Sequence, residues 1–437
     1  MAYTQGYRDN VVIPDKYNTG CKGELTQFSE TATVGTVTSG DGNSVKIVYD
    51  SAKSQIIINS YSNSNLANET LVENYDFSEF PFVTTNTANF KETKKVVFRN
   101  CKFKGITHDK NSVSNLYLEF ERCTFSACVV GSNITMNKCY IGEDSTSDGM
   151  NAFKNYFVND CLVAGLLSEA NTNGTHVDGI QIYGHNSYEA GNIHLKNVRF
   201  SMPNFYYDGT STSYVNASIM LKLEQNNAND ITFEDIMVDM GGRYTPFYST
   251  QPSGFTVTDV TFKDITVSDN YKDAESLFYT GSYNENTEVI NVGCKSDLYV
   301  SSVWKDDEGK THIICTNNSV LDARTLLVKT NLGEKNFTID RSPNQTELLG
   351  VAEYQAYTYE DMPYDVECII DENVNYIVCY DTEVSEENQI RFVEFSATQT
   401  YETVNDLFKG ICDAIREKTQ TSEPIKHTDI PEKIRLL

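Results

Sequence analysis

The chain is short of basic residues and of long apolar runs. Its 437 residues include 35 Lys and Arg against 61 Asp and Glu, which gives a formal net charge of −26 at pH 7. This balance argues against nucleic acid or an anionic membrane as the main partner, because both attract positive charge. No apolar run reaches the roughly 18 residues of a membrane-spanning helix, and the opening MAYTQGYRDN has no signal-peptide core. We therefore expect a soluble protein that is not exported by the Sec route and does not insert into a membrane.

A short pattern recurs seven times between about Lys94 and Asp269. Each copy has two or three alternating apolar residues, a polar residue, a small apolar anchor, one further residue, and an aromatic or aliphatic one. The copies are VVFRNCKF, LEFERCTF, ITMNKCYI, YFVNDCLV, IHLKNVRF, ITFEDIMV and FTVTDVTF. Alternation with a period of two makes each copy a strand with one buried face, and the polar residue before the anchor suits a corner.

The anchors of these copies are spaced as in a stacked repeat, because they lie 22, 16, 22, 37, 38 and 24 residues apart. They are Cys101, Cys123, Cys139, Cys161, Val198, Ile236 and Val260. One unit cannot bury its apolar face alone, so the units must stack at about 4.8 Å per coil, which predicts a parallel β-helix. The alternative is an antiparallel sandwich, whose hairpins should show short turns at a regular spacing of about 8–12 residues.

The chain has eleven cysteines, and four of them are anchors of successive copies. Such a column favours small, buried, reduced thiols that fill a narrow core, and argues against disulfides. No spacing of His or Cys makes a closed set of metal ligands, so we expect neither a metal site nor another cofactor.

Four regions are expected from the changes of pattern. Residues 1–43 are aperiodic and suit an attachment arm or a cap on the first coil, and residues 44–292 hold the coils. Residues 293–397 change to longer β-rich segments with hairpin-like turns, which predicts a smaller antiparallel β-sandwich. Residues 398–437 place apolar residues at helical intervals before a proline-marked tail, which predicts a short C-terminal helix. The expected fold class is therefore all-β with one short helix.

Two coils carry a strand that opens with Asp-Gly, at Asp148 and at Asp178. Compared with the coil of Asp148, the coil of Asp178 has 8 extra residues before its aspartate and 7 after it, which predicts loops that wall a cleft. Carboxyl groups on equivalent strands of neighbouring coils would lie about 5 Å apart, the separation that a retaining glycosidase uses. Such crowding also pushes the two pKa values apart, so that one group can donate a proton and the other accept one. His176 and Glu169 lie nearby and complete the predicted catalytic set.

The same residues have a simpler interpretation. Asp-Gly is a very common turn dipeptide, and an aspartate at a corner often only bonds nearby backbone amides. His176 then belongs to a loop without a catalytic part.

Aromatic and charged residues near these strands form a predicted glycan-binding set. Tyr183 follows the strand of Asp178, the loop SMPNFYYDGTSTSY supplies Tyr206 and Tyr207, and the strand SIMLKLEQ alternates Lys222 and Glu224. Exposed rings beside acids and amides suit the stacking of sugar rings. The alternative is that these rings cover an interface between protomers.

The repeat and the segment HVDGIQIYG resemble the pectate-lyase-like right-handed β-helix superfamily, which includes polygalacturonases, polysaccharide lyases and phage tailspikes. The resemblance covers nearly all of the predicted coils and implies a right-handed parallel β-helix. Asp178 matches the acid of the Asn-Thr-Asp motif of polygalacturonases, Gly184 and His185 half match their Gly-His-Gly motif, and Leu221-Lys222 loosely matches their Arg-Ile-Lys motif. The adjacent aspartate pair of that family is missing, so the resemblance implies the fold rather than pectin hydrolysis.

A second resemblance involves both ends of the chain. The segment from Ile411 to Ile434 is similar to the endings of tail and baseplate structural proteins of phages and prophages of Gram-positive gut bacteria, and IPDKYNTGCKGELT resembles their beginnings. Phage β-helix proteins of this kind are usually homotrimers. The resemblance therefore implies a homotrimer in the virion that is made in the host cytoplasm and released by lysis.

Together these observations predict a phage tail fibre or tailspike. Its expected partners are a bacterial surface polysaccharide and other tail or baseplate proteins. The sequence leaves open whether the protein only binds the glycan or also cleaves it, as a glycoside hydrolase or lyase would. The alternative is a non-catalytic structural protein of the baseplate or a virion-decoration protein.

Overall fold

The structure is a computed structural model, and the residues that it describes form strands, turns, bends and irregular segments, with no helix among them. The predicted C-terminal helix lies outside these residues. The described residues are 12–34, 46–59, 69–85, 90, 93–110, 113–143, 145–166, 177–184, 188–202, 205–207, 212–214, 217–223, 226–241, 246–250, 255–267, 287–294, 298–317, 319, 322–341, 365–383 and 391–395.

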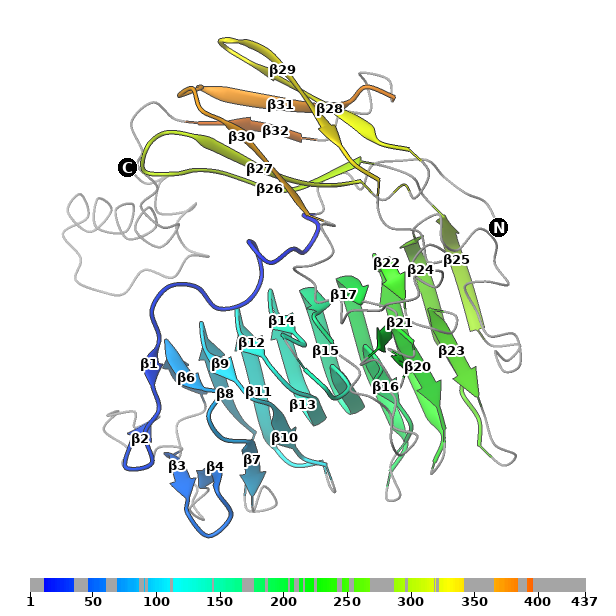
Figure 1. The fold of residues 1–437 in the computed structure, drawn as a ribbon. Coiled ribbons are helices and arrows are strands. Elements are labelled where there is room, and N and C mark those ends of the chain that lie inside the picture. The colour runs from blue at the N-terminus through cyan, green and yellow to red at the C-terminus, as the bar shows by residue number, and fades with distance from the viewer. Residues whose placement is uncertain are drawn as a thin grey trace, which may run out of the picture.

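Most of the strands belong to one sheet of 23 strands, in which three sets of strands pair in parallel (Figure 1). Set 1 contains β4 (Gln55–Asn59), β7 (Phe82–Thr85), β10 (Ile106–His108), the beginnings of β13 (Val129–Asn137) and β15 (Met150–Ala164), then β16 (Ile180–Ile182), β20 (Ile219–Lys222) and β23 (Phe247–Thr250).

Set 2 contains β5 (Glu69–Glu73), β8 (Lys94–Arg99), β11 (Leu116–Glu121), later parts of β13 and β15, then parts of β17 (Ala190–Met202), β21 (Ala228–Glu234), β24 (Val260–Val267) and β25 (Thr287–Cys294). Set 3 contains β1 (Thr26–Gln27), β6 (Tyr75–Phe77), β9 (Lys102–Phe103), β12 (Thr124–Phe125), β14 (Tyr140–Ile141) and β22 (Met237–Gly241), together with the ends of β15, β17, β24 and β25. Each repeat of the sequence therefore contributes one segment to each set. Before the first repeat, β2 (Thr33–Val34) and β3 (Lys46–Asp50) pair antiparallel, and β3 pairs antiparallel with β4.

The chain turns from set 2 to set 3 at a single residue in the left-handed conformation. This corner residue stands directly before the anchor in every repeat, and its φ lies between 50° and 61°. The sequence predicted its place correctly in six of the seven copies. The corner residues are Asn74, Asn100, Arg122, Lys138, Asp160, Asn197, Asp235 and Asp264. For a residue with a Cβ this conformation costs about 1–2 kcal/mol, and least for Asn and Asp. Some corner amides offset that cost, because Asn100 Nδ2 donates to Asn74 Oδ1 at 2.8 Å and Asn197 Nδ2 donates to Asp160 Oδ1 at 2.7 Å.

Like residues stack on like residues behind the corner. The four anchor cysteines are free and fully buried, which confirms the predicted inward column of thiols: Cys101, Cys123, Cys139 and Cys161. Burial also raises the pKa of the Cys123 and Cys161 thiols well above the usual range. Beside the column the rings of Phe77 and Phe103 stack with their centroids 5.2 Å apart. Identical packing in successive repeats thus holds the stack in register.

The seventh predicted anchor is wrong. Val260 pairs with Ile231 in set 2, and Ile265 occupies the anchor position, because the neighbouring Thr266 pairs with Met237 of set 3. The error has a local cause. Asp259 also has a positive φ and precedes a valine, so the corner before set 2 imitates the corner before set 3.

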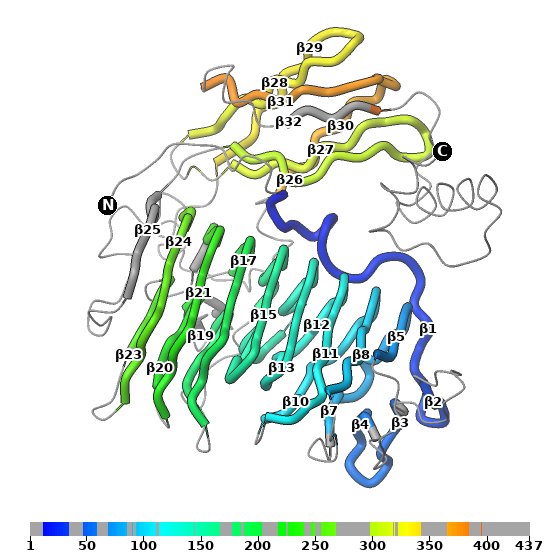
Figure 2. The backbone as a smooth tube through the Cα atoms, turned by 180° about the vertical axis from the view of Figure 1, so that it is seen from behind, coloured from blue at the N-terminus to red at the C-terminus, as the bar shows by residue number. Residues whose placement is uncertain are grey.

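Two smaller antiparallel sheets follow the large one and lie at one end of its strands (Figures 1 and 2). The three-stranded sheet contains β26 (Leu298–Lys305), β27 (Thr311–Asn317) and β30 (Val366–Ile370). The four-stranded sheet contains β28 (Arg324–Thr330), β29 (Gly333–Ile339), β31 (Tyr376–Asp381) and β32 (Arg391–Glu394). The two sheets share one apolar core, to which Leu298 and Ile313 contribute from the first and Leu326 and Ile377 from the second.

Residues 12–27 form a strap that runs across the repeats toward β1 (dark blue in Figures 1 and 2). The strap bonds to corner residues of set 3: Asn197 Nδ2 donates to the Val12 carbonyl at 2.8 Å, and Asn100 Nδ2 donates to the Lys22 carbonyl at 2.9 Å. At its end β1 pairs with β6. One continuous segment therefore contacts repeats that are far apart in the stack.

The corner conformation makes a prediction for stability. Lys138 is exposed and has a φ of 53°, so Lys138→Gly should relieve about 1–2 kcal/mol of strain against an entropic cost of about 0.5–1 kcal/mol. The expected result is a small net stabilisation in urea unfolding. Lys104→Gly is the matched control, since exposed Lys104 has no positive φ and should only lose stability. Equal losses in both variants would contradict the corner argument.

Candidate functional site

The two aspartates predicted as catalytic occupy equivalent places in neighbouring repeats. Met150 of β15 pairs with Ile180 of β16, so Asp148 and Asp178 each stand two residues before a paired residue of set 1. The sequence predicted this register. Glu169 and His176, the other members of the predicted catalytic set, lie outside the described residues.

Each of these aspartates also bonds the backbone of the next repeat. The Asp178 amide donates to Asp148 Oδ1 at 2.9 Å, and the Ala217 amide donates to Asp178 Oδ1 at 3.1 Å. The Asp178 side chain is fully buried, whereas Asp148 is half-buried. This geometry matches the simpler interpretation, in which an aspartate at a corner bonds backbone amides.

The glycine after each aspartate has a packing reason. A Cβ on Gly149 would lie 2.6 Å from the Gly179 carbonyl oxygen, and a Cβ on Gly179 would lie 2.5 Å from the Ser218 carbonyl oxygen. Neither distance is tolerable against backbone atoms. The Asp-Gly dipeptide therefore follows from the close approach of successive repeats as well as from the carboxylate bonds.

Tyr183 lies at the other end of set 1. The pairing of Ile182 with Leu221 places Tyr183 beside Lys222 in the next repeat, and both side chains are half-buried. Tyr183 lies five positions after Asp178, which corresponds to about 16 Å along an extended chain. The predicted catalytic pair and these glycan-binding residues thus lie at opposite ends of the same strands.

The rings of Tyr183 and Tyr188 both lie against the ring of Phe153, and these three residues are named here the aromatic corner. The Phe153 ring lies 5.1 Å from the Tyr183 ring and 6.4 Å from the Tyr188 ring, edge to face in both pairs. A bulge causes this arrangement. Gly131 pairs with Ala152 and Ser132 with Lys154, so Phe153 is the extra residue in β15 and is excluded from the main core.

Tyr188 and its chain neighbour Glu189 both make polar contacts. The Tyr188 hydroxyl lies 3.2 Å from Ser132 Oγ, and its burial raises the pKa of this phenol. The exposed Glu189 accepts hydrogen bonds from Asn227 Nδ2 at 3.2 Å and from Asn229 Nδ2 at 3.3 Å. Half-buried rings, amides, a carboxylate and an ammonium group therefore occur within neighbouring repeats. The sequence identified Tyr183 and Lys222 but missed Phe153 and Tyr188, because only the bulge turns Phe153 toward them.

The remaining predicted glycan-binding residues are only partly described. Tyr206 and Tyr207 lie on β18 (Phe205–Tyr207), which pairs antiparallel with β19 (Thr212–Tyr214) and is separate from the large sheet. The structure describes the backbone of this hairpin and not its side chains, and Glu224 lies outside the described residues.

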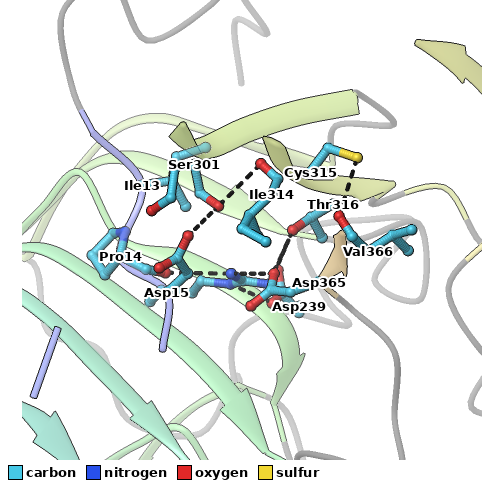
Figure 3. Close-up of polar contacts among 12 residues, drawn as sticks. Ile13, Pro14, Asp15, Asp239, Ser301, Ile314, Cys315, Thr316, Asp365 and Val366 are labelled. Atoms are coloured by element: carbon cyan, nitrogen blue, oxygen red, sulfur yellow. Dashed lines mark hydrogen bonds and ion pairs between the residues drawn. The ribbon is translucent and has the colours of Figure 1, made fainter. Parts of the chain in front are cut away.

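A second polar cluster joins the strap, set 3 and the three-stranded sheet (Figure 3). Arg199 of β17 is fully buried, and its Nε donates to Asp239 Oδ2 of β22 at 2.7 Å. Arg199 Nη1 donates to Asp365 Oδ1, before β30, at 2.8 Å. In the strap, Asp15 Oδ2 accepts a hydrogen bond of 2.5 Å from Ser301 Oγ of β26. We name these four charged residues the junction cluster.

Sequence reasoning missed the junction cluster. In the repeat, Arg199 follows the anchor Val198, a position that in other repeats is taken by Lys102 or Tyr140 at the outer face. At Arg199 this position is covered by the strap, through the Pro14 carbonyl, and by Thr316 and Asp365 of the three-stranded sheet and the segment before it. No local pattern signals that contact, because Asp365 lies 166 residues further along the chain.

Among the described residues, no group of three or more His, Cys, Asp or Glu side chains is arranged to hold a metal ion. Within the same part of the chain, no helix is long and apolar enough to cross a membrane.

The backbone contact of Asp178 makes a prediction. Asp178→Ala should leave the buried Ala217 amide without its acceptor and cost about 1–3 kcal/mol of stability, whereas Asp178→Asn keeps an oxygen for that bond and should cost less. The midpoints of urea unfolding measure both. Asp148→Ala is the control at a half-buried site and should fall between the two. If Asp178→Ala unfolds at the midpoint of the unsubstituted protein, the carboxylate has no part in holding the repeats together.

The comparisons with known proteins assign no family: the chain matches no family model, no curated protein and no solved structure at a significant level.

Proposed function

We propose that this chain is a phage tail fibre or tailspike protein that binds a bacterial surface glycan. The observation that supports this function best is the aromatic corner, where half-buried Tyr183 and Tyr188 lie beside Lys222 and Glu189 of neighbouring repeats. Sugar-binding sites combine apolar ring faces with a few placed polar groups, and this corner offers both. An acidic protein that is short of basic residues also suits a partner other than nucleic acid.

The finer architecture belongs to the same proposal. The three parallel sets are the three faces of a right-handed parallel β-helix, and the two smaller sheets are an antiparallel β-sandwich. The protein docks on other tail or baseplate proteins, and the virion holds it as a homotrimer. The repeated pairing of each set with itself supports the β-helix, since one turn of the chain adds one segment to every set.

The contacts of the two aspartates favour glycan binding over glycan cleavage. Asp148 and Asp178 each give a carboxylate oxygen to a backbone amide, and Asp178 is fully buried. A general acid or base must reach the proton that it transfers. Cleavage is retained as a second candidate because the register places the two acids one repeat apart, as a retaining glycosidase requires.

A structural role in the baseplate or as a decoration protein is the remaining alternative. The buried contacts between the strap, set 3 and the three-stranded sheet favour a structural role, because they join distant parts of the chain. In that case the aromatic corner faces another protein rather than a sugar.

The binding function predicts the effect of two substitutions. Tyr183→Ala and Tyr188→Ala should each weaken adsorption to candidate host cells or to their purified surface glycan by about 2- to 10-fold, because each removes a ring worth about 0.5–1.5 kcal/mol. Tyr117→Ala is the matched control: this half-buried tyrosine lies on β11, three repeats away, and its loss should leave adsorption unchanged. Equal adsorption by all three variants would remove the aromatic corner from the binding site.

Glycan cleavage has a separate prediction. If Asp178 transfers a proton, Asp178→Asn should slow cleavage of the host glycan on the order of 10²-fold or more while binding persists. Chromatography of the glycan after incubation measures this directly. Intact glycan after prolonged incubation with the unsubstituted protein would exclude cleavage of that substrate and leave the binding function standing.

A further inference from the structure

The junction cluster holds more negative than positive charge. Asp15 comes from the strap, Asp239 and Arg199 from set 3, and Asp365 from the segment before β30. The side chains of Arg199 and Asp239 are at most 1% exposed, and that of Asp365 is 3% exposed. Hydroxyl groups and two backbone amides also bond these carboxyls: the Tyr17 and Asn18 amides donate to Asp15 Oδ1 at 2.7 and 2.8 Å. Lys22 of the strap acts on Asp15 through its field.

Physical chemistry limits how this cluster can be charged. One guanidinium can balance one carboxylate, so three ionised carboxyls would leave two uncompensated charges in a buried site. A buried charge is strongly unfavourable unless it is paired. Binding a proton is the less costly solution for a buried acid.

We propose that the junction cluster is a proton-dependent latch: when Asp15 and Asp239 are protonated it holds the strap and the three-stranded sheet against set 3, and it loosens when they ionise.

The hydrogen bonds of the cluster suit this division of roles. Asp365 Oδ1 accepts from Arg199 Nη1 at 2.8 Å and from Thr316 Oγ1 at 2.6 Å, two donors that favour its ionised form. Asp15 Oδ2 lies 2.5 Å from Ser301 Oγ. When the Asp15 carboxyl is neutral, its O–H can donate a hydrogen bond to this oxygen, while the Ser301 hydroxyl donates to the Ile314 carbonyl at 3.4 Å. Burial raises the pKa of Asp15 and the nearby Asp365 adds to that rise, and together they outweigh the hydrogen bonds from Ser301, Ser302 and the Asn18 amide, which act in the opposite direction. Burial also raises the pKa of Asp239 in spite of its ion pair with Arg199.

A second contact between the strap and the same sheet responds to pH in the same direction. The ring centroid of Trp304 on β26 lies 5.1 Å from that of Tyr17 in the strap and 4.9 Å from that of His312 on β27. Both nitrogens of His312 face carboxylates, Nδ1 at 2.8 Å from Glu367 and Nε2 at 3.2 Å from Asp306. Partial burial works against a charged ring, but these two acids outweigh it and raise the pKa of His312.

The sign of the effect is the same for all three groups. Each pKa is raised in the folded protein above its ordinary value, 3.8 for the aspartates and 6.5 for the histidine. The stability that each contributes is therefore complete below its ordinary value and is lost as the pH rises through the folded value. The latch is closed at acidic pH and opens toward neutral and alkaline pH.

Hydrogen exchange on the full chain tests the latch. From a pH below 3.8, the ordinary value of the aspartates, to about pH 8, after correction for intrinsic exchange, amides of the strap and of β26 should lose protection by about 10-fold or more. Peptides from β11 and β13, inside the stack, should keep theirs. Trp304 is the only tryptophan of the chain, so the emission maximum of its fluorescence reports the same opening as a shift to longer wavelength.

Substitutions distinguish an effect of the junction cluster from a general effect of pH on the protein. Asp15→Asn stays neutral and keeps an acceptor, so strap protection should persist to higher pH, and Asp239→Asn should act in the same direction. Asp230→Asn, at a side chain 57% exposed on set 2, is the control and should follow the unsubstituted protein. Strap protection that does not change with pH, or that falls on acidification, would overturn the proposal. So would folded Asp15→Asn and Asp239→Asn variants that both retain the pH profile of the unsubstituted protein.

Discussion

The left-handed corner between set 2 and set 3 is the constraint on which the rest of the structure depends. One residue with positive φ turns the chain, and the next residue then packs behind the corner, where small side chains such as Cys101 and Val198 are fully buried. Because every repeat turns at the same place, identical positions stack and their strands pair in parallel. The strap uses the same feature, since the corner amides Asn100 and Asn197 bond its backbone.

Much of this large sheet could be predicted because the corner leaves a local signature. A polar residue before a small apolar one, after alternating apolar residues, encodes both the turn and the buried face, and six of seven anchors are correct. The failure at Val260 shows the limit of that signature. Asp259 and Asp264 are both left-handed corner residues five positions apart, and only their pairing partners show which of the two turns leads to set 3.

The candidate sites were less predictable, because they depend on what covers a residue rather than on its place in the repeat. The register of Asp148 and Asp178 follows from counting residues. Their bonds to backbone amides and the burial of Asp178 follow from how closely the next repeat approaches. Phe153 belongs to the aromatic corner only because a bulge moves it out of the core. Arg199 is buried only because a sheet from the far end of the chain docks on it.

The composition and the junction cluster act in the same direction. A chain with a net charge of −26 repels itself, and this repulsion grows as the remaining acids ionise, so it already opposes tight docking at neutral pH. At a surface, water and salt screen most of that repulsion. Screening is weak at the junction cluster, because Arg199, Asp239 and Asp365 are almost completely removed from solvent. A change in proton binding therefore acts on the contact between the stack and the smaller sheets, whereas the apolar column behind the corner, which carries no charge, holds the stack together across the same range of pH.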